Sequence, residues 1–329
     1  MRSLKDKTVL ITGGTGSFGQ AFTKQILELK EAKNVIVFSR DELKQFEMQA
    51  EFSSINLKFI LGDVRDYERL LEATVGVDII IHAAAMKQIT ASELNPMEAI
   101  KTNILGAENI VKSAIENKVG AVIALSTDKA SNPVNLYGAT KLCSDKLMIA
   151  GNNLSKNSQT IFSVVRYGNV LGSRGSVVPL FLKQSKSGKV TVTDENMTRF
   201  WLSIEDGVKL VLDSLEIMLG GEIFIPKIPS FKVIDVAKVV APDAQIDIIG
   251  IRPGEKLHEI MITEDDSIYT REFDNYYVIL SPELLNSKNY INSGKLVSVN
   301  FRYSSDTNSL WHTHKTFKEK LESIGLVTY

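Results

Sequence analysis

The chain has 329 residues, and its 38 basic and 39 acidic side chains leave a formal net charge of -1. This balance gives no global argument for nucleic acid or an anionic membrane as a partner. The single cysteine, Cys143, excludes an intramolecular disulfide, and the four histidines form no cluster spaced to hold a metal. The sequence starts without a signal-peptide pattern, and no apolar run reaches the ~18 residues of a membrane span. We therefore expect a cytoplasmic protein of one or two domains.

Short β-branched runs alternate with amphipathic stretches through the first half of the chain. The runs read TVLITG, NVIVFSR, LKFILGD, DIIIHAAA, AVIALST and IFSVVRYG. After the first run, Phe18, Phe22 and Ile26 recur every fourth position, which is the spacing of one helix face. Apolar strands that alternate with helices predict an α/β fold with a doubly wound parallel sheet of the Rossmann type.

The alternation loosens after about Tyr167 into loops rich in glycine or proline, such as GNVLGSRGSVVP and GIRPGEKLHE. Polar side chains on loops beside a rigid sheet suit ligand binding. We expect a dinucleotide-binding domain over residues 1–167, to which a segment at about 197–222 returns. A smaller substrate-binding domain is expected mainly over 168–286, followed by a C-terminal extension over 287–329.

The stretch LITGGTGSFG places Gly13, Gly16 and Gly19 at the turn from the first strand into the first helix. Glycines there let backbone N–H groups approach a pyrophosphate, and the helix N-terminus favours its negative charge. A glycine triplet alone could be a tight turn, but the strand before it and the helix after it favour dinucleotide binding. The cofactor contacts expected in this turn are Gly13, Thr15, Gly16, Ser17, Phe18 and Gly19.

The second strand ends in VFSRDELK, about 20 residues after the last glycine, where the residue that distinguishes NAD from NADP normally lies. Arg40 can pair with a 2′-phosphate and Lys44 adds charge, so we predict NADP, although Asp41 could instead bind a ribose hydroxyl. Asp63, after the third strand, could accept from the adenine amino group. Further cofactor contacts are expected from Ser39, Val64, Ala83 and Ala84.

Polar groups gather in LSTDKASNPVNLYGATK, which runs from Leu125 to Lys141. Tyr137 and Lys141 are four residues apart and therefore lie on the same helix face. A lysine ammonium beside the phenol would lower the phenol pKa and could also hold the cofactor ribose. Tyr137 could then act as a general base for a hydroxyl group. This spacing also recurs by chance, but beside a dinucleotide fingerprint the catalytic interpretation is favoured.

These motifs resemble the extended short-chain dehydrogenase/reductases, in which Y-x-x-x-K is the catalytic pair. Within them the sequence is similar to the UDP-N-acetylglucosamine 4,6-dehydratases that also invert C5, enzymes of pseudaminic acid and related sugar pathways. The similarity covers nearly the whole chain, and STDKA is its most specific motif. Other matching stretches are FSRDELKQFEM, GDVRD, IHAAAMK, NPMEAIKTNI, RYGNVLGSRGSVVP, MTRFW, IPKIPS, GIRPGEKLHE and YSSDTN.

The resemblance implies a three-step cycle in which NADP is recycled in place. Tyr137 would remove the C4 hydroxyl proton while hydride leaves C4, and Thr127 would orient that hydroxyl. Lys129 is then the expected base at C5, and Asp128 the acid that releases the C6 hydroxyl as water before hydride returns to C6. These roles require a neutral lysine and a protonated carboxyl, which a desolvated pocket favours. Without the resemblance, Asp128 and Lys129 would be interpreted as a structural ion pair.

The resemblance also implies a nucleotide-sugar site on the later loops. Lys87 is expected near the amide or C6 region of the sugar, and Asn169 on the diphosphate side. Arg199 and Arg252 would hold the phosphates, whose oxygens match a guanidinium fork, and Glu255 the uridine ribose. The substrate contacts expected are Lys87, Tyr137, Asn169, Val177, Thr193, Arg199, Arg252 and Glu255.

The sequence departs from the family at Gln88, Ile89 and Thr90, where the usual residues are His-Val-Pro. This loop lines the sugar pocket, so the identity of the sugar and the inversion at C5 follow less directly than dehydration itself. Cys143, two residues past Lys141, is expected in the core behind the catalytic helix.

Other functions stay open. A UDP-hexose 4-epimerase would use the tyrosine and lysine but needs no acid and base at 128 and 129, whereas a retaining 4,6-dehydratase would keep the C5 configuration. A regulatory protein that senses NADP could lose Tyr137 or Lys141 freely. Relatives imply a homo-oligomer, either a dimer or a hexamer.

Overall fold

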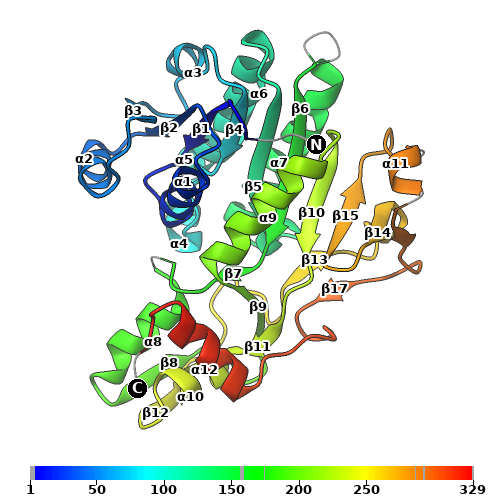
Figure 1. Cartoon of the computed structure of the whole chain (residues 1–329). Helices are drawn as coiled ribbons and strands as arrows, with labels where there is room; N and C mark the ends of the chain where they lie inside the picture. Colours follow the sequence, from blue (N-terminus) through cyan, green and yellow to red (C-terminus); the bar gives the residue numbers. More distant parts are fainter. Residues whose placement is uncertain (1–3, 156–158, 174, 286, 292, 328–329) are drawn as a thin grey trace.

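A computed structural model describes residues 4–155, 159–173, 175–285, 287–291 and 293–327. Within these ranges a 10-stranded sheet forms the centre of the molecule, with the order β16-β14-β15-β10-β6-β5-β4-β1-β2-β3 (Figure 1). The parallel strands are β1 (Thr8–Thr12), β2 (Asn34–Ser39), β3 (Leu57–Leu61), β4 (Ile79–His82), β5 (Ala121–Thr127), β6 (Ile161–Tyr167) and β10 (Glu222–Pro226). The antiparallel strands that extend this sheet are β15 (Tyr276–Leu280), β14 (Thr270–Glu272) and β16 (Lys295–Leu296).

The central part of the sheet has the order β3-β2-β1-β4-β5-β6, which is that of a Rossmann sheet. Val9, Leu10 and Ile11 in β1 are fully buried because helices cover both faces, as the unbroken apolar run predicted. The strand order reverses between β1 and β4. In such sheets ligands bind outside the carboxyl ends of the strands at this point. The predicted doubly wound α/β fold is confirmed.

Two groups of helices cover the sheet (Figure 1). Helices α1 (Ser17–Leu29) and α9 (Ile204–Ile217) pack together on one face. Helices α3 (Tyr67–Ala73), α6 (Gly106–Glu116) and α7 (Leu136–Leu154) form the other group. The remaining helices of the large lobe include α2 (Glu42–Glu51), α4 (Ile89–Leu94), α5 (Pro96–Ile100), the π-helical turn η1 (Lys101–Leu105), the 3-10 turn η3 (Ser267–Tyr269) and α11 (Lys288–Ile291).

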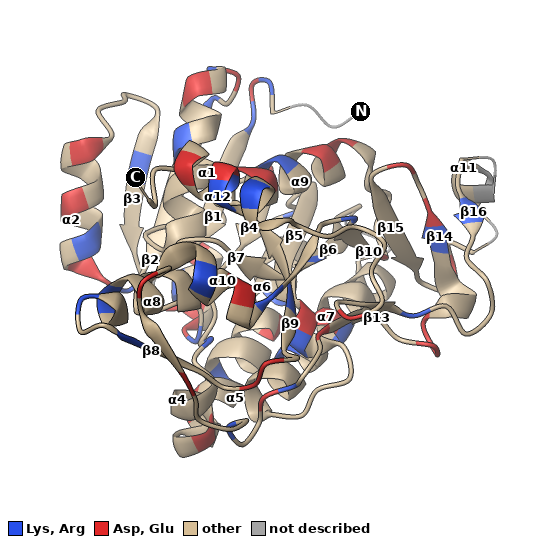
Figure 2. Cartoon of the chain, turned by 90° about the horizontal axis from the view of Figure 1, so that it is seen from below, with Lys and Arg blue, Asp and Glu red and all other residues tan. Residues whose placement is uncertain are grey.

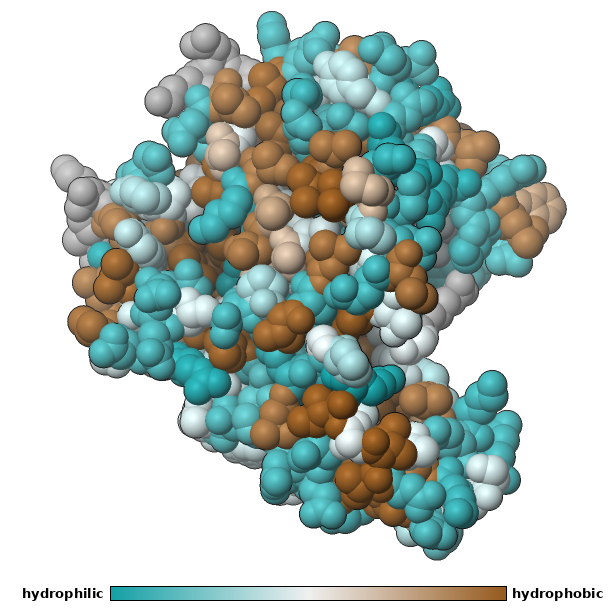
Figure 3. Space-filling model, turned by 180° about the vertical axis from the view of Figure 1, so that it is seen from behind, coloured by the Kyte–Doolittle hydropathy of each residue, from teal (hydrophilic) through white to brown (hydrophobic). Residues whose placement is uncertain are grey.

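A smaller lobe packs around a second hydrophobic cluster and projects from the larger body (Figure 3). Its elements are α8 (Val177–Ser185), β8 (Lys189–Val192), α10 (Val233–Val240), β12 (Gln245–Ile248) and α12 (His314–Ser323). A 3-stranded sheet of β7 (Asn169–Val170), β9 (Thr198–Leu202) and β11 (Ser230–Lys232) lies beside it among the described residues.

Strand β9 belongs to both lobes, because successive side chains of a strand point to opposite faces. Phe200 and Leu202 pack in the large cluster, whereas Trp201 packs in the small one. The predicted domain boundaries therefore stay a prediction, since the lobes interleave along the chain. A separate antiparallel pair, β13 (Ile260–Ile262) with β17 (Tyr303–Ser304), brings part of the predicted C-terminal extension against the end of the GIRPGEKLHE loop.

Acidic and basic residues are interspersed along the ribbon (Figure 2), in keeping with the net charge of -1. Among the described residues, no helix is both long and apolar enough to cross a membrane. The same residues contain no group of three or more His, Cys, Asp or Glu side chains that could hold a metal ion.

Phe317 of α12 is fully buried, 4.6 Å from Phe231 and 5.7 Å from Trp201 between ring centroids. We expect Phe317→Ala to lower the free energy of unfolding by about 3–5 kcal/mol, the usual cost of an aromatic cavity in a core. Urea unfolding followed by circular dichroism measures this change. The matched control is Phe46→Ala, at a side chain of α2 that is 70% exposed, which should change the free energy by less than ~0.5 kcal/mol. Equal losses in both variants would contradict the packing of α12.

Candidate active site

The predicted residues meet in a cavity outside the carboxyl ends of the parallel strands, between the sheet and the smaller lobe. Its volume is about 1090 Å³. Most small-molecule sites measure ~300–1,000 Å³, so this cavity has room for a dinucleotide and a second ligand. Every residue predicted to contact cofactor or substrate lines the cavity. Of the predicted catalytic residues, Thr127, Lys129, Tyr137 and Lys141 line it, while Asp128 lies buried behind the wall.

At one end of the cavity the turn between β1 and α1 meets the loop after β4. Gly13 has a φ of +66°, and a Cβ there would lie 2.8 Å from the Cα of Ala84. A Cβ on Gly19 would lie 2.4 Å from the Cα of Gly14. Gly16 caps α1 without a side-chain hydrogen bond, so the first N–H groups of the helix remain available to an anion.

Asp41 and Arg40 have different surroundings at the tip of β2. The Asp41 carboxylate caps α2 by accepting the Lys44 backbone N–H at 3.1 Å, and it also pairs with the Lys44 ammonium. These hydrogen bonds lower the pKa of Asp41. The Arg40 side chain is 69% exposed, and its Nη1 lies 3.8 Å from Oδ2 of Asp63. Asp41 is therefore engaged by its own helix, whereas the Arg40 guanidinium is accessible at the cavity rim.

Asp63, which was expected to accept from adenine, already has a partner on its own loop. Its Oδ2 accepts from Nη2 of Arg65 at 2.6 Å, and its Oδ1 accepts from the Arg65 backbone N–H at 3.0 Å. Although burial opposes it, these bonds hold the pKa of Asp63 below its usual value. The carboxylate still lines the cavity.

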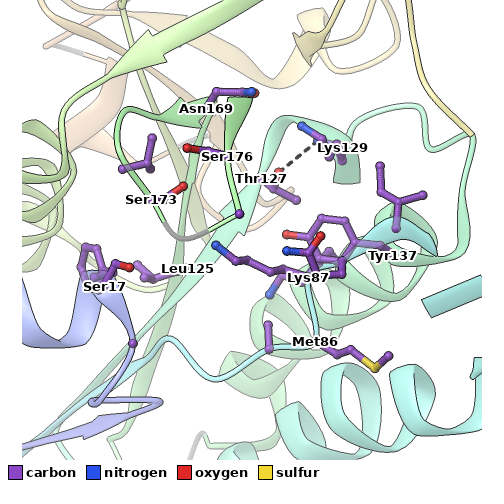
Figure 4. Close-up of a pocket in the computed structure, with 18 of the residues that line it drawn as sticks. Ser17, Met86, Lys87, Leu125, Thr127, Lys129, Tyr137, Asn169, Ser173 and Ser176 are labelled. Carbon is purple, nitrogen blue, oxygen red and sulfur yellow. Dashed lines mark hydrogen bonds between the residues drawn. The ribbon is translucent and has the colours of Figure 1, made fainter. Parts of the chain in front are cut away.

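The buried strand β5 ends at Thr127 and turns at once into the 3-10 turn η2 (Asp128–Ala130). Asp128 is fully buried, and its Oδ1 accepts from the Thr127 hydroxyl at 2.9 Å and from Nζ of Lys129 at 3.0 Å. Its Oδ2 has no hydrogen-bond partner among the described residues. The Lys129 side chain is 21% exposed and reaches the cavity wall near Tyr137 (Figure 4).

The structure corrects the protonation state predicted for Lys129. Nζ of Lys129 also lies 3.3 Å from Oε1 of Glu259, a residue the sequence interpretation did not include. Burial alone would lower the pKa of Lys129, but the charges of Asp128 and Glu259 outweigh it, and the pKa is raised. The expectation of a neutral lysine is therefore wrong for this state of the site. Burial and the charge of Glu259 raise the pKa of Asp128, which is the direction that its expected role as an acid requires.

The phenol of Tyr137 also differs from the expectation. Burial raises its pKa to about 12, and the opposing influences come from Lys129 and the Thr127 hydroxyl rather than from Lys141. The ammonium of Lys141 lies 3.5 Å from the hydroxyl of Ser144, and burial lowers its pKa. The predicted pair does share one face of α7, with both side chains buried, but Lys141 does not lower the pKa of the phenol here.

The two arginines predicted to hold phosphates differ in availability. Arg199 is 7% exposed, and its Nη1 and Nη2 donate to the backbone carbonyls of Thr198 at 2.7 Å and Lys256 at 2.9 Å. These contacts within the protein make Arg199 a poor phosphate ligand in this state. Arg252 is 63% exposed at the rim and pairs with Glu255. Only Arg252 thus has the accessibility that the prediction requires.

The departure at residues 88–90 lies on the cavity wall. Nε2 of Gln88 is 2.9 Å from the point where a Cβ on Gly175 would stand, so this loop and the loop before α8 approach closely. Neighbouring Lys87 reaches into the cavity (Figure 4), and burial lowers its pKa.

Sequence reasoning missed two charged residues of the site and misplaced one other residue. Lys256 and Glu259 line the cavity beside Lys129, and both belong to the quoted stretch GIRPGEKLHE, which was the available signal. Cys143 is exposed rather than in the core. The buried face of α7 includes Tyr137, Lys141 and Ser144, and position 143 falls outside that face.

A Rossmann-type sheet with a glycine-rich turn after its first strand, together with a helix that carries a tyrosine and a lysine four residues apart, is typical of the extended short-chain dehydrogenase/reductases. Residues 9–281 match the family described as polysaccharide biosynthesis protein, and the chain belongs to that family. It is 56% identical, over 95% of its length, to the inverting UDP-N-acetylglucosamine 4,6-dehydratase of Campylobacter jejuni, of which it covers 96%. A protein of Rickettsia canadensis named UDP-glucose 4-epimerase is 42% identical over 97% of the chain and 94% of that protein. The X-ray structure of Pen from Bacillus thuringiensis superposes with a TM-score of 0.92 and 37% identity, covering 99% of this chain and 100% of that one.

Gly138 offers a test of the contact between α7 and η2, because a Cβ there would lie 2.2 Å from the backbone oxygen of Lys129. We expect Gly138→Ala to push η2 away from α7 while the protein stays folded. The turnover of UDP-N-acetylglucosamine should fall at least ~tenfold, which corresponds to a rise of ~1.4 kcal/mol in the activation free energy. Steady-state kinetics and thermal unfolding measure the two effects.

The matched control is Gly207→Ala in the first turn of α9, where the nearest atom to a new Cβ is Cδ1 of Leu202 at 3.7 Å. This variant should keep full turnover. If Gly138→Ala also kept full turnover, the contact between α7 and η2 would not position Lys129.

Proposed function

We propose that the chain is an NADP-dependent UDP-N-acetylglucosamine 4,6-dehydratase that inverts C5. The observation that carries the proposal is Lys129 at the cavity wall beside Tyr137, with its Nζ 3.0 Å from the carboxyl of Asp128, which is buried directly behind that wall. An acid and an amine at this place serve elimination of water, and the 56% identity to the Campylobacter jejuni dehydratase supports the same reaction. The product would enter the biosynthesis of pseudaminic acid or a related surface sugar.

Each residue has one task in the proposed reaction. Tyr137 takes the C4 hydroxyl proton, and Thr127, which hydrogen-bonds to Asp128, orients that hydroxyl. Once C4 is a ketone and the C5 proton is acidic, Lys129 in its amine form takes that proton and Asp128 gives one to the departing C6 hydroxyl. When bound, NADP would accept hydride from C4 and return it to C6, so no net redox change occurs. Tyr137 rests as a phenol and Lys129 as an ammonium, so each must release its proton to solvent in the open cavity before it can act as a base.

The residues at the dinucleotide end fit NADP. Gly13 approaches the backbone of Ala84 too closely for any side chain at position 13, and this turn lies next to the N-terminus of α1, which has no side-chain cap. The accessible guanidinium of Arg40 favours a 2′-phosphate, whereas Asp41 is already occupied as the cap of α2. An accessible Arg40 beside an engaged Asp41 supports NADP over NAD.

Arg40→Ala is expected to weaken NADP binding about 10- to 100-fold, because a charge-assisted hydrogen bond contributes ~1.5–3 kcal/mol. NAD lacks the 2′-phosphate, so its affinity should stay within about a factor of two of the wild-type value. Titration calorimetry with both dinucleotides measures the difference. Unchanged NADP affinity would exclude Arg40 as the 2′-phosphate ligand.

A UDP-hexose 4-epimerase is the second candidate, favoured by the name of the Rickettsia canadensis relative at 42% identity. An epimerase returns hydride to C4 and gives no task to Asp128 and Lys129. A retaining dehydratase would use the same pair with the opposite C5 outcome, and an NADP-sensing regulator would use neither. The buried acid and the amine beside Tyr137 support a dehydratase over an epimerase or a regulator. The 56% identity to the inverting dehydratase of Campylobacter jejuni supports inversion over retention at C5.

The decisive assay is incubation of the purified protein with UDP-N-acetylglucosamine in D2O, without added cofactor, followed by NMR. We expect a 4-keto-6-deoxy sugar of arabino configuration with deuterium at C5. UDP-N-acetylgalactosamine without solvent deuterium would identify an epimerase, and a labelled product of unchanged C5 configuration a retaining dehydratase. An unchanged sugar would exclude this substrate and direct attention to the loop at residues 88–90.

We also propose that the protein works as a cytoplasmic homo-oligomer, a dimer or a hexamer. Exposed apolar side chains on neighbouring helices support self-association, namely Leu94 (76% exposed), Met97 (56%) and Leu105 (43%). A single cysteine supports a reducing compartment.

A further inference from the structure

Glu259 lies directly before β13 at the wall of the cavity, and only 2% of it is exposed. Its backbone is fixed from both sides by one residue of the C-terminal segment. The N–H of Glu259 donates to Oγ of Ser305 at 2.9 Å, and its carbonyl accepts the N–H of Ser305 at 2.8 Å. The carboxylate is therefore held in place by its own backbone and by the strand pair of β13 with β17.

Three cations surround this carboxylate. Oε1 lies 3.3 Å from Nζ of Lys129 and 3.7 Å from Nε of Arg199, while Oε2 lies 3.7 Å from Nζ of Lys256. Burial alone would raise the pKa of Glu259, but these charges outweigh it and hold the pKa below its usual value. A buried charge persists only when paired in this way, so Glu259 is an anion at neutral pH.

We propose, resting on the dehydratase function above, that Glu259 is a positioning residue that fixes the Lys129 amine at the cavity wall and sets the pH at which it exchanges its proton. Without Glu259, Asp128 would be the only carboxyl partner of Lys129 in the part of the chain that the structure describes. Glu259 supplies the permanent anion, which leaves Asp128 free to carry a proton. The two carboxyls thus divide the roles of anion and acid, as paired titratable groups in different surroundings do.

The direction of the pH effect follows from the charges that face Lys129. Asp128 and Glu259 raise its pKa, Arg199 lowers it, and Glu259 also raises the pKa of Asp128. Lys256 pairs with Glu259 and so affects Lys129 through that carboxylate. Tyr137 faces Lys129 as a neutral phenol at neutral pH. Removing the charge of Glu259 therefore lowers the pKa of both the amine and the acid. The dehydration rate depends on both groups, so both limbs of its bell-shaped pH profile should move to lower pH.

The first experiment measures dehydration of UDP-N-acetylglucosamine against pH for the wild type, Glu259→Gln, Glu259→Asp and Glu264→Gln. Glu259→Gln should move both limbs down by at least ~1 pH unit, since a unit charge near 3 Å has effects of this size or larger. Glu259→Asp, which keeps the charge, should restore the limbs toward the wild-type positions. The control Glu264→Gln, at an exposed carboxyl after β13, should leave the profile unchanged. A Glu259→Gln profile that is lower at every pH with its limbs unmoved would overturn the proposal.

A second experiment needs no substrate and separates this proposal from the proposed function. Protein labelled with [ε-13C]lysine is titrated by NMR up to about pH 11, above the ~10.4 of an ordinary lysine, with the Lys129 signal assigned by its loss in Lys129→Arg. The signal should titrate at lower pH in Glu259→Gln than in the wild type. If it does while the wild type leaves UDP-N-acetylglucosamine unchanged, the control of Lys129 by Glu259 stands and the substrate assignment fails. If the wild type turns over and the Lys129 signal titrates alike in both proteins, the Glu259 proposal fails alone.

Discussion

The lysine ammonium held between two buried carboxyl groups is the interaction on which the candidate site depends. Lys129 lies 3.0 Å from Asp128 and 3.3 Å from Glu259, in surroundings where an unpaired charge would be costly. The turn after β5 supplies one carboxyl, and the loop before β13 supplies the other. The pairing therefore joins the Rossmann sheet to the GIRPGEKLHE loop and sets the charge of the site before any ligand arrives.

Much of the fold and of the ligand-lining positions followed from the sequence, because both depend on local patterns. Apolar runs such as TVLITG are long enough to mark buried strands, and Phe22 and Ile26 repeat with the period of a helix. The ends of such strands then converge at one edge of the sheet. Gly13 and Tyr137 could be assigned to one cavity on this basis, and both line it.

The charge state of the site could not be predicted, because it depends on contacts between segments far apart in the chain. Burial favours a neutral lysine, and that reasoning fails once Glu259 stands beside Lys129. Arg199 shows the same limit, since its guanidinium is engaged by backbone carbonyls that no motif reveals. At the tip of β2, Asp41 could have been a ribose ligand or a helix cap, and its bond to the Lys44 N–H identifies it as the cap.

The two hydrogen bonds between Ser305 and the backbone of Glu259 mean that the site is completed late in the synthesis of the chain. Domains generally fold in order from the N-terminus as the chain emerges, so the Rossmann strands and the turn with Lys129 can form early. Glu259 cannot be fixed until residue 305 has been made and β17 has paired with β13. A chain that ends before residue 305 would therefore carry the Lys129 turn without a fixed Glu259 carboxylate beside it.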